Sequence, residues 1–313
     1  NQAGALVHVY KDGSIYLNHG GTEMGQGLFI KVAQVVANEF GVKLDQVKVS
    51  ATSTSKVPNT SPTAASSGSD LNGMAAKEAC IRIKRNLCDF AVQHFGVDVN
   101  DVNFEDSNVF LGDKKMTFKE FISLAFLNRV ELFSNGYYKT PKIYYDEAKK
   151  QGRPFFYYSY GVCLSEVIVD CLTGEYKLVA VDILHDVGAS LNPAIDMGQI
   201  VGGFIQGMGW LCSEELKWDD SGVLLTTGAS TYKIPAIGDT PEHFNVKIKP
   251  NISNHENTIH KSKAVGEPPL MLALSVWLAI KNAIYNEDNN NKTGLDAPAS
   301  FEKVFFNLNK KFN

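Results

Sequence analysis

The segment Ser262–Pro269, with the sequence SKAVGEPP, carries the sharpest candidate for catalysis, the carboxylate of Glu267. Gly266 allows close approach of a ligand, and two prolines stiffen the chain that follows. Because proline disfavours the helical region for the residue before it, we expect Glu267 to lie just outside an apolar helix over residues 270–285. A rigidly held carboxylate of this kind suits a general base. The alternative is that Glu267 only caps the helix.

A glycine-rich loop precedes the helix that apolar spacing predicts over residues 28–40. Gly20–Gly27, with the sequence GGTEMGQG, holds four glycines in eight residues. Glycines let backbone N–H groups approach a ligand, and a helix N-terminus favours anions and oxo groups. No lysine of a P-loop follows, and the spacing does not fit a dinucleotide fingerprint. A ligand loop and a simple tight turn both remain open.

A hydroxyl-rich segment, Thr60–Ser69, leads into a long helix predicted over residues 70–95 with Asp70 as its N-cap. Hydroxyls and backbone N–H groups of such a segment can surround a phosphate or a polar heterocycle. The small side chains of Ala64 and Ala65 would leave room for a flat ligand. A surface loop rich in serine and threonine is the equally open alternative.

A weak internal repeat links these features. A hairpin over residues 7–17 is followed by the glycine-rich loop, where Glu23–Gln26 (EMGQ) opens a helix. A second hairpin over residues 167–181 is followed by Asp196–Gln199 (DMGQ), which also opens a helix. Two such units could present Gln26 and Gln199 to one cleft, although four matching letters can also be coincidence.

The pattern of elements predicts an α+β protein. Hairpins alternate with helices and no βαβ series runs through the chain, so we expect two-layer sandwiches of antiparallel or mixed sheets with helices on one face, in two repeat-related subdomains. The expected domains are residues 1–150, residues 151–285 and a poorly ordered, polar tail over residues 286–313. Phe118–Leu127 is a further predicted helix, with Thr117 as its cap.

Composition excludes several classes of protein. The chain has 313 residues, of which 44% are hydrophobic and 20% charged, as in ordinary globular proteins. The net charge of −4 gives no basic surface for nucleic acid, and we find no apolar run of about 18 residues that would span a membrane. Five cysteines without C-x-x-C spacing predict reduced thiols in the core of a cytoplasmic protein.

Five motifs, in this order along the chain, resemble the molybdenum hydroxylases, the family of xanthine dehydrogenases and aldehyde oxidases. They are GGTEMGQG (Gly20–Gly27), VPNTSPTAAS (Val57–Ser66), SLNPAIDMGQ (Ser190–Gln199), STYKIP (Ser230–Pro235) and SKAVGEPP (Ser262–Pro269). The likeness spans about residues 3–285, and it is strongest to the carboxyl-terminal half of the molybdenum-binding subunit of bacterial xanthine dehydrogenases. We therefore expect that this chain, which begins at Asn1, is a fragment of a longer subunit.

The resemblance implies roles for individual residues. Glu267 matches the general base, and Ala64 and Ala65 match the walls of the substrate slot. The positions that match cofactor-binding residues are Gly25, Gln26, Gly27, Ser66, Gln199, Lys263, Ala264, Val265 and Gly266. Gly68 stands where many relatives carry serine. The molybdenum would be held by the pterin, with no ligand directly from the protein.

The activity that the resemblance implies is molybdenum-dependent hydroxylation of a purine, xanthine or hypoxanthine, with oxygen from water. Electrons would pass to iron–sulfur centres and FAD on partner domains or a partner subunit, and then to NAD, in a cytoplasmic hetero-oligomer. An aldehyde substrate remains open, because the residues that choose the substrate would lie in the upstream half. The form of the pterin, mono-phosphate or cytosine dinucleotide, also remains open.

A protein of another class, a non-catalytic cofactor-binding or assembly fragment, is the third alternative. Glu267 argues against it, because a fold without activity has no need of a carboxylate between glycine and two prolines. We expect the isolated fragment to be inactive, since the resemblance implies a site closed between two halves.

Overall fold

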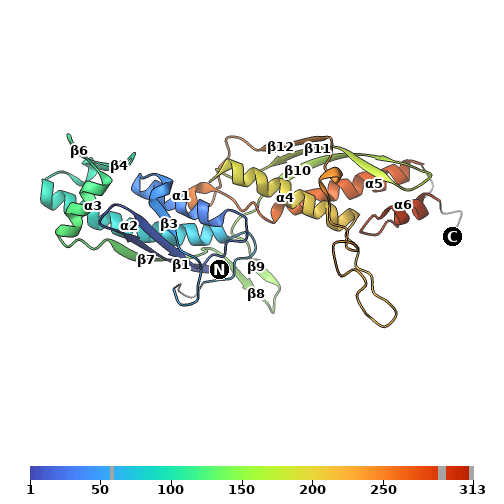
Figure 1. The fold of residues 1–313 in the computed structure, drawn as a ribbon, viewed down its shortest axis with the longest axis horizontal. Coiled ribbons are helices and arrows are strands. Elements are labelled where there is room, and N and C mark those ends of the chain that lie inside the picture. The colour runs from blue at the N-terminus through green and yellow to red at the C-terminus, as the bar shows by residue number, and fades with distance from the viewer. Residues whose placement is uncertain (57–59, 288–293, 310–313) are drawn as a thin grey trace. The chain divides into compact units, whose positions relative to one another are not determined.

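The computed structural model describes residues 1–56, 60–287 and 294–309, which form two compact units (Figure 1). Unit 1 comprises Asn1–Tyr158 and Asn254–Ser262, and unit 2 comprises Ser159–Ser253 and Lys263–Asn313. The chain passes from unit 1 to unit 2 after Tyr158, whereas the predicted domain boundary was at residue 150. Residues 57–59, which begin the second motif, and residues 288–293 and 310–313 of the expected tail lie outside the described residues.

Unit 1 is built on a four-stranded mixed sheet. Its strands are β1 (Gln2–Val9), β2 (Ile15–His19), β3 (Val47–Val49) and β7 (Phe133–Lys139). The order is β3-β2-β1-β7, in which β1 pairs antiparallel with β2 and β7, and β2 pairs parallel with β3. Two helices, α1 (Leu28–Phe40) and α2 (Gly68–Phe95), pack with it around one hydrophobic core. α2 begins before Asp70, so the prediction of Asp70 as its N-cap is wrong.

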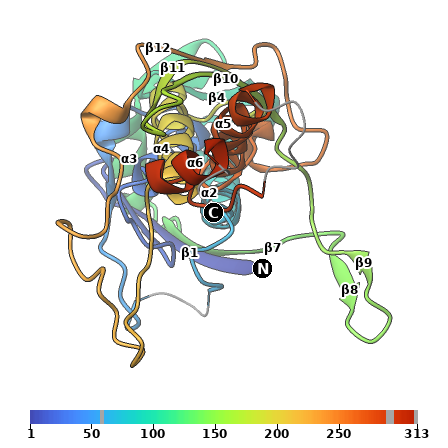
Figure 2. The same cartoon turned by 90° about the vertical axis from the view of Figure 1, so that its right-hand side faces the viewer.

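The remaining elements of unit 1 are a small sheet, a helix, a hairpin and three 3-10 turns. They are β4 (Val102–Glu105), β5 (Asn108–Leu111), β6 (Lys114–Thr117), α3 (Phe118–Leu127), β8 (Tyr144–Asp146), β9 (Gln151–Arg153), η1 (Leu44–Gln46), η2 (Val99–Asp101) and η4 (Ile259–Lys261). The predicted Thr117 cap of α3 is confirmed as a capping box with Glu120. The β8–β9 hairpin stands away from the four-stranded sheet in both ribbon views (Figures 1 and 2).

Unit 2 has a three-stranded sheet covered on one face by helices. The elements are β10 (Gly161–Val169), β11 (Tyr176–His185), α4 (Pro193–Cys212), η3 (Ile237–Asp239), β12 (His243–Ile248), η5 (Pro268–Ala273), α5 (Leu274–Glu287) and α6 (Phe301–Leu308). β11 pairs antiparallel with β10 and parallel with β12. α4 and α5 run along this sheet in both views (Figures 1 and 2). Their inward side chains, including Phe204, Val276 and Ile280, form the core of the unit.

Each unit repeats the same order of elements, which confirms the predicted α+β class. In unit 1 the series is β1, β2, α1, β3, α2, and in unit 2 it is β10, β11, α4, β12, α5. In both, a hairpin is followed by a helix, a strand parallel to the second hairpin strand, and a second helix. The matching tetrapeptides are not equivalent, however. Glu23–Gln26 precedes α1, whereas Asp196–Gln199 lies within the first turns of α4.

Two expectations near the carboxyl terminus need correction. Part of the expected tail forms α6, because Ser300 accepts a hydrogen bond from the Lys303 N–H as its N-cap and Val304 is fully buried in the core of unit 2. Residues 268–285 do reach the length and apolarity of a membrane span. One face of the segment buries Ala273, Val276 and Ile280 in the core of unit 2, whereas the other leaves Met271, Leu274 and Leu278 exposed.

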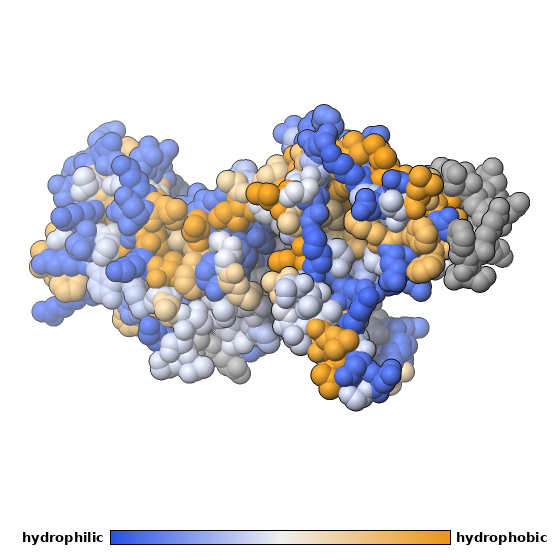
Figure 3. Space-filling view, turned by 45° about the vertical axis from the view of Figure 1, so that its right-hand side comes forward, coloured by the Kyte–Doolittle hydropathy of each residue, from blue (hydrophilic) through white to orange (hydrophobic). Residues whose placement is uncertain are grey.

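The other face of the unit 2 sheet is open. Val162, Leu164 and Ile168 alternate along β10 with half-buried residues and are 56%, 70% and 63% exposed. On the side of the molecule seen in Figure 3, hydrophobic patches lie among hydrophilic ones. The sheet therefore has one face in the core and one face on the surface.

Candidate functional site

The glycine-rich loop folds around the carboxylate of Glu23. This carboxylate accepts hydrogen bonds from the backbone N–H groups of Gly25 (2.8 Å), Gly27 (3.0 Å) and Phe29 (2.9 Å). Burial alone would raise the pKa of Glu23, but these hydrogen bonds outweigh it and lower the pKa. Glu23 is part of the sequence motif. The motif alone did not show that its carboxylate would accept hydrogen bonds from three backbone N–H groups of the loop.

Gln26 closes the same loop. Its side-chain Oε1 accepts from the Met24 N–H at 2.6 Å, and its Nε2 donates to the Thr22 carbonyl at 2.9 Å. Gly25 has φ +98°, and a Cβ added to it would meet nothing within 4 Å. The loop thus presents an open backbone surface at Gly25, framed by an amide side chain that is already oriented.

The hydroxyl-rich segment lies beside this loop. The Thr22 N–H donates to Oγ1 of Thr63 at 2.9 Å, and a Cβ on Gly20 would lie only 2.6 Å from Oγ1 of Thr60. Ala65 and Ser66 both have left-handed backbone angles, with φ of 53° and 52°. Such angles are unfavourable for residues other than glycine and occur often at ligand sites. Unit 1 therefore brings the glycine-rich loop and the hydroxyl-rich segment into contact at Thr22 and Thr63.

A half-buried carboxyl group lies near the start of α2. Asp70 accepts a 2.5 Å hydrogen bond from the Tyr157 hydroxyl. Burial raises the pKa of Asp70 to about 7, although the hydrogen bonds from Tyr157 and the Ile259 backbone and the charge of Lys31 act in the opposite direction. This contact ties α2 to the chain at Tyr157, a link that composition alone did not reveal.

In unit 2, the predicted cofactor and catalytic residues meet at α4. Asn192 caps this helix by accepting from the Ile195 N–H, and Gln199 lies within its second turn. Gly203 and Gly207, one turn apart, face the segment that carries Glu267. A Cβ at Gly203 would lie 3.2 Å from the Gly266 carbonyl oxygen, and one at Gly207 would lie 2.4 Å from that of Leu270. The glycines therefore let this backbone lie directly against α4.

The segment at residues 263–266 is held on both sides by hydrogen bonds. The Lys263 N–H donates to the Val187 carbonyl at 2.8 Å, and the Ser159 hydroxyl donates to the Ala264 carbonyl at 2.8 Å. Val265 is 5% exposed and belongs to the core of unit 2. The segment is thus a fixed stretch of backbone, as a positioned ligand site requires.

Glu267 is exposed at the end of this segment and precedes η5. Its backbone has φ −83° and ψ −33°, so the prediction that Pro268 drives it out of the helical region is wrong. The reason is the hydrogen bond from the Leu270 N–H to the Glu267 carbonyl (3.0 Å), which closes the first 3-10 turn. The side chain makes no capping hydrogen bond to η5, so the structure does not support a purely capping role.

Within each unit, these groups are of the kind that can contact a polar organic molecule. They offer amides, hydroxyls and backbone, with open space at Gly25 and at Gly198, where an added Cβ would also meet nothing within 4 Å. Among the described residues, no group of three or more His, Cys, Asp or Glu side chains could hold a metal ion. Each unit contributes its own set of residues: Gly25, Gln26, Gly27, Ala64, Ala65 and Ser66 in unit 1, and Gln199, Lys263, Ala264, Val265, Gly266 and Glu267 in unit 2.

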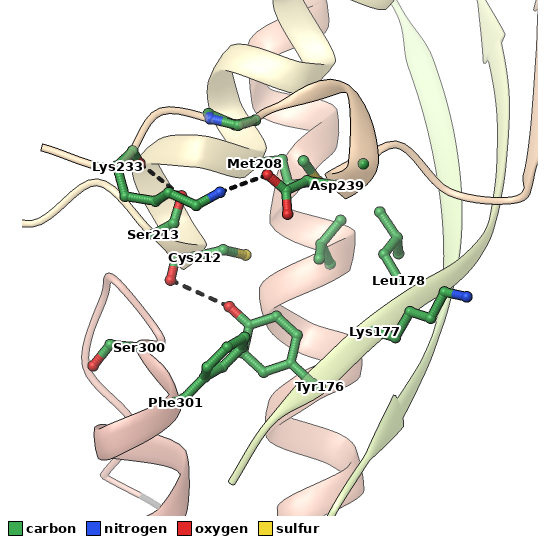
Figure 4. A pocket seen from close by; sticks show the side chains of 13 residues that line it. Tyr176, Lys177, Leu178, Met208, Cys212, Ser213, Lys233, Asp239, Ser300 and Phe301 are labelled. Atoms are coloured by element: carbon green, nitrogen blue, oxygen red, sulfur yellow. Dashed lines mark hydrogen bonds and ion pairs between the residues drawn. The ribbon is translucent and has the colours of Figure 1, made fainter. Parts of the chain in front are cut away.

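A separate cavity of about 280 Å³ lies in unit 2 (Figure 4). Leu178, Met208 and Val276 give it an apolar wall, and the Lys233–Asp239 ion pair lies at its edge. The Tyr176 hydroxyl donates to the Cys212 carbonyl at 3.2 Å. None of the predicted site residues lines this cavity, so it is distinct from the candidate site.

Residues 1–241 match the family model of the molybdopterin cofactor-binding domain, and the chain belongs to this family. It corresponds to part of the molybdenum-binding region of the molybdenum hydroxylases. Xanthine dehydrogenase/oxidase of Gallus gallus is 46% identical over 97% of the chain, which spans 21% of that relative's length.

Solved structures share the fold. CO dehydrogenase from Oligotropha carboxidovorans superimposes with a TM-score of 0.84 at 20% identity, covering 99% of this chain and 37% of the other. Aldehyde oxidoreductase from Desulfovibrio desulfuricans gives 0.74 at 25% identity, covering 97% and 30%. The family-model match over residues 1–241 confirms the predicted family, and the chain covers about a fifth of its curated relative.

Proposed function

We propose that this chain supplies part of the cofactor-binding and catalytic region of a molybdenum-dependent hydroxylase that acts on a purine. The observation that carries the proposal is the placement of Glu267, an exposed carboxylate on a fixed backbone segment that does not cap the helix behind it. The identity of 46% with a xanthine dehydrogenase/oxidase along nearly the whole chain supports the purine as substrate.

The residues of the chain would act by binding, orienting and moving a proton. Bound molybdopterin would supply two-electron redox chemistry. Backbone at Gly25 and Gly27 and the amides of Gln26 and Gln199 would hold it, together with Ser66 and the backbone of residues 263–266. Ala64 and Ala65 would form the walls of a slot for a flat ring. The Glu267 carboxylate would take the proton from the attacking water-derived oxygen.

The rest of the enzyme would complete this site. We place the substrate-orienting residues in an upstream half, and iron–sulfur centres and FAD on partner domains or a partner subunit that passes electrons to NAD. We propose a cytoplasmic hetero-oligomer with these parts, in which the fragment alone would be inactive. The length of the relatives, about five times that of this chain, supports such additional parts.

Replacing Glu267 by glutamine in the complete enzyme tests the proposal. General acid–base catalysis contributes about 10²–10⁴-fold, so the variant should lose turnover of xanthine by at least about 100-fold. Molybdenum and pterin content should stay at the wild-type level. Glu166→Gln, on the exposed face of β10, is the matched control and should keep full turnover. Near-normal turnover in Glu267→Gln would exclude the general-base role.

An aldehyde is the second candidate substrate. The structural likeness to an aldehyde oxidoreductase at 25% identity favours it, although the identity with the xanthine dehydrogenase/oxidase is higher. Measuring kcat/KM for xanthine and for benzaldehyde with the same enzyme decides between them. A ratio in favour of benzaldehyde would replace the purine assignment while leaving the role of Glu267 in place.

A further inference from the structure

We propose that Asp186 is a positioning residue that holds the catalytic segment of unit 2 in place through a buried ion pair with Lys263. This inference rests on the proposed function, in which Glu267 at the end of that segment is the general base. Asp186 follows the last residue of β11, and Lys263 opens the segment that ends at Glu267. The two residues are 77 positions apart in the sequence.

Both partners of the ion pair are withdrawn from water. Nζ of Lys263 lies 2.6 Å from Oδ2 of Asp186, and the two side chains are only 6% and 4% exposed. The second carboxylate oxygen, Oδ1, accepts from the Gly188 N–H at 2.8 Å. The Asp186 N–H donates to the Tyr160 carbonyl at 2.8 Å. Asp186 is therefore held at its backbone and at Oδ1 by neighbours other than Lys263, which leaves Oδ2 to accept from the ammonium group.

Both the backbone and the side chain of Lys263 have defined partners. Its backbone N–H donates to Val187, the residue after Asp186, at 2.8 Å. Its ammonium group also lies 4.9 Å from the centre of the Tyr160 ring, within the range of a cation–π contact. The main chain and the side chain of Lys263 thus contact the same short turn, which fixes both the position and the direction of the chain that leaves it.

This anchor matters because it fixes the start of the segment, which Ser159 holds next at the Ala264 carbonyl and which the core holds at Val265. Gly266 has no side chain, and the close contact of its carbonyl with Gly203 only limits its approach to α4. Downstream, Pro268 and Pro269 stiffen the chain. The Glu267 carboxylate therefore lies between a rigid proline pair and the Lys263 anchor, and a shift at Lys263 would be transmitted to it.

A purely structural role is the competing explanation. Removing one partner of a buried ion pair leaves an uncompensated charge and destabilises strongly, whereas replacing both partners by apolar residues is often neutral. Stability and positioning can therefore be separated. The double variant Asp186→Leu/Lys263→Met should keep the fold but lose the directional contact between the carboxylate and the ammonium.

The test compares variants of the complete enzyme. For Asp186→Asn we expect kcat to fall by about tenfold or more, as for other residues that orient a functional group, while KM changes by less than about threefold. Molybdenum and pterin content, measured after denaturation, should remain at the wild-type level. Asp182→Asn is the matched control, because Asp182 lies on the exposed face of β11, just before Asp186 in the chain, and accepts from Asn245 at 2.7 Å. It should leave kcat unchanged.

The double variant gives the decisive comparison. We expect it to restore the wild-type Tm but not kcat, and it also serves if Asp186→Asn does not accumulate as folded enzyme. Wild-type kcat in Asp186→Asn, or recovery of kcat together with Tm in the double variant, would overturn the positioning role. A loss of activity that matches a loss of molybdenum would do the same. Failure of the proposed function is distinguishable, because Glu267→Gln would then retain turnover whatever Asp186 does.

Discussion

The α-carbon of Gly207 on α4 faces the carbonyl oxygen of Leu270 so closely that a Cβ at residue 207 would lie 2.4 Å from that oxygen. Real Cβ atoms do not approach backbone oxygen at this distance, so the helix and the turn that follows Glu267 depend on the missing side chain. The glycines that weaken the helical appearance of residues 200–210 in the sequence are thus needed for packing.

Gly207→Ala should therefore destabilise unit 2. Forcing extra volume into a packed contact costs about 1–3 kcal/mol, which exceeds the gain of about 0.5–1 kcal/mol from replacing glycine by alanine in a helix. Gly202→Ala is the matched control, because a Cβ there would meet nothing within 4 Å. It should be neutral or stabilising. Urea unfolding of both variants provides the measurement, and equal stability of the two would contradict the contact.

Stability should decline in mild acid because of His19. Burial lowers the pKa of this side chain to about 4 from its usual 6.5, and the charge of Glu23 only partly opposes this shift. Between about pH 6.5 and pH 4, His19 therefore binds a proton in the unfolded chain but stays neutral in the folded protein. The stabilisation is complete above pH 6.5 and is lost as the pH falls towards 4, by up to about 3 kcal/mol.

Comparing the free energy of unfolding at pH 4.5 and pH 7 measures this effect. His19→Gln should flatten the acid limb, whereas His8→Gln should retain it. Asp70 acts in the opposite sense, since its raised pKa gives stabilisation that is lost as the pH rises towards about 7. The slope for His19 is therefore best measured in an Asp70→Asn background. An unchanged slope in His19→Gln would show that another group titrates.

Filling the unit 2 cavity should stabilise the protein. Val276 lines it and is 1% exposed, so Val276→Ile places one more methyl group in apolar surroundings. A buried methylene contributes about 0.8 kcal/mol, and we expect a rise in Tm of a few degrees by calorimetry. Val162→Ile, on the exposed face of β10, should leave Tm unchanged. A lower Tm for Val276→Ile would mean that the cavity cannot accept the added group.

Local signals in the sequence predicted much of the fold. Residues 28–40 form the expected helix, which ends at Gly41 in the left-handed conformation, and Thr117 caps α3. β7 was missed because its sequence, FSNGYYK, shows neither apolar alternation nor β-branched residues. Its Gly136 instead permits contact with α2, where a Cβ would lie 1.9 Å from the Ala75 carbonyl oxygen. Such requirements arise only from packing.

In the candidate site, too, local sequence predicted some features, whereas others arise only from packing. The motifs predicted that the glycine-rich loop and Glu267 each come just before a helical segment, and the structure confirms this. These positions could be predicted because each motif and its helical segment are adjacent in the sequence. The partners that hold them could not be found in this way. Lys263 and Asp186 are far apart in the chain, and the contact of Thr22 with Thr63 depends on how two loops meet. A sequence read locally gives the type of chemical group but not the groups that orient it.

Neither unit is a continuous stretch of the polypeptide, because residues 254–262 return to unit 1 after 95 residues of unit 2. This returning strip buries Ile259 completely, beside Gly73 of α2. A gene cut after Tyr158 would therefore encode a first unit without part of its own core. The two units therefore cannot be exchanged between relatives as separate continuous segments. Recombination that keeps unit 1 intact would have to keep at least residues 1–262 together.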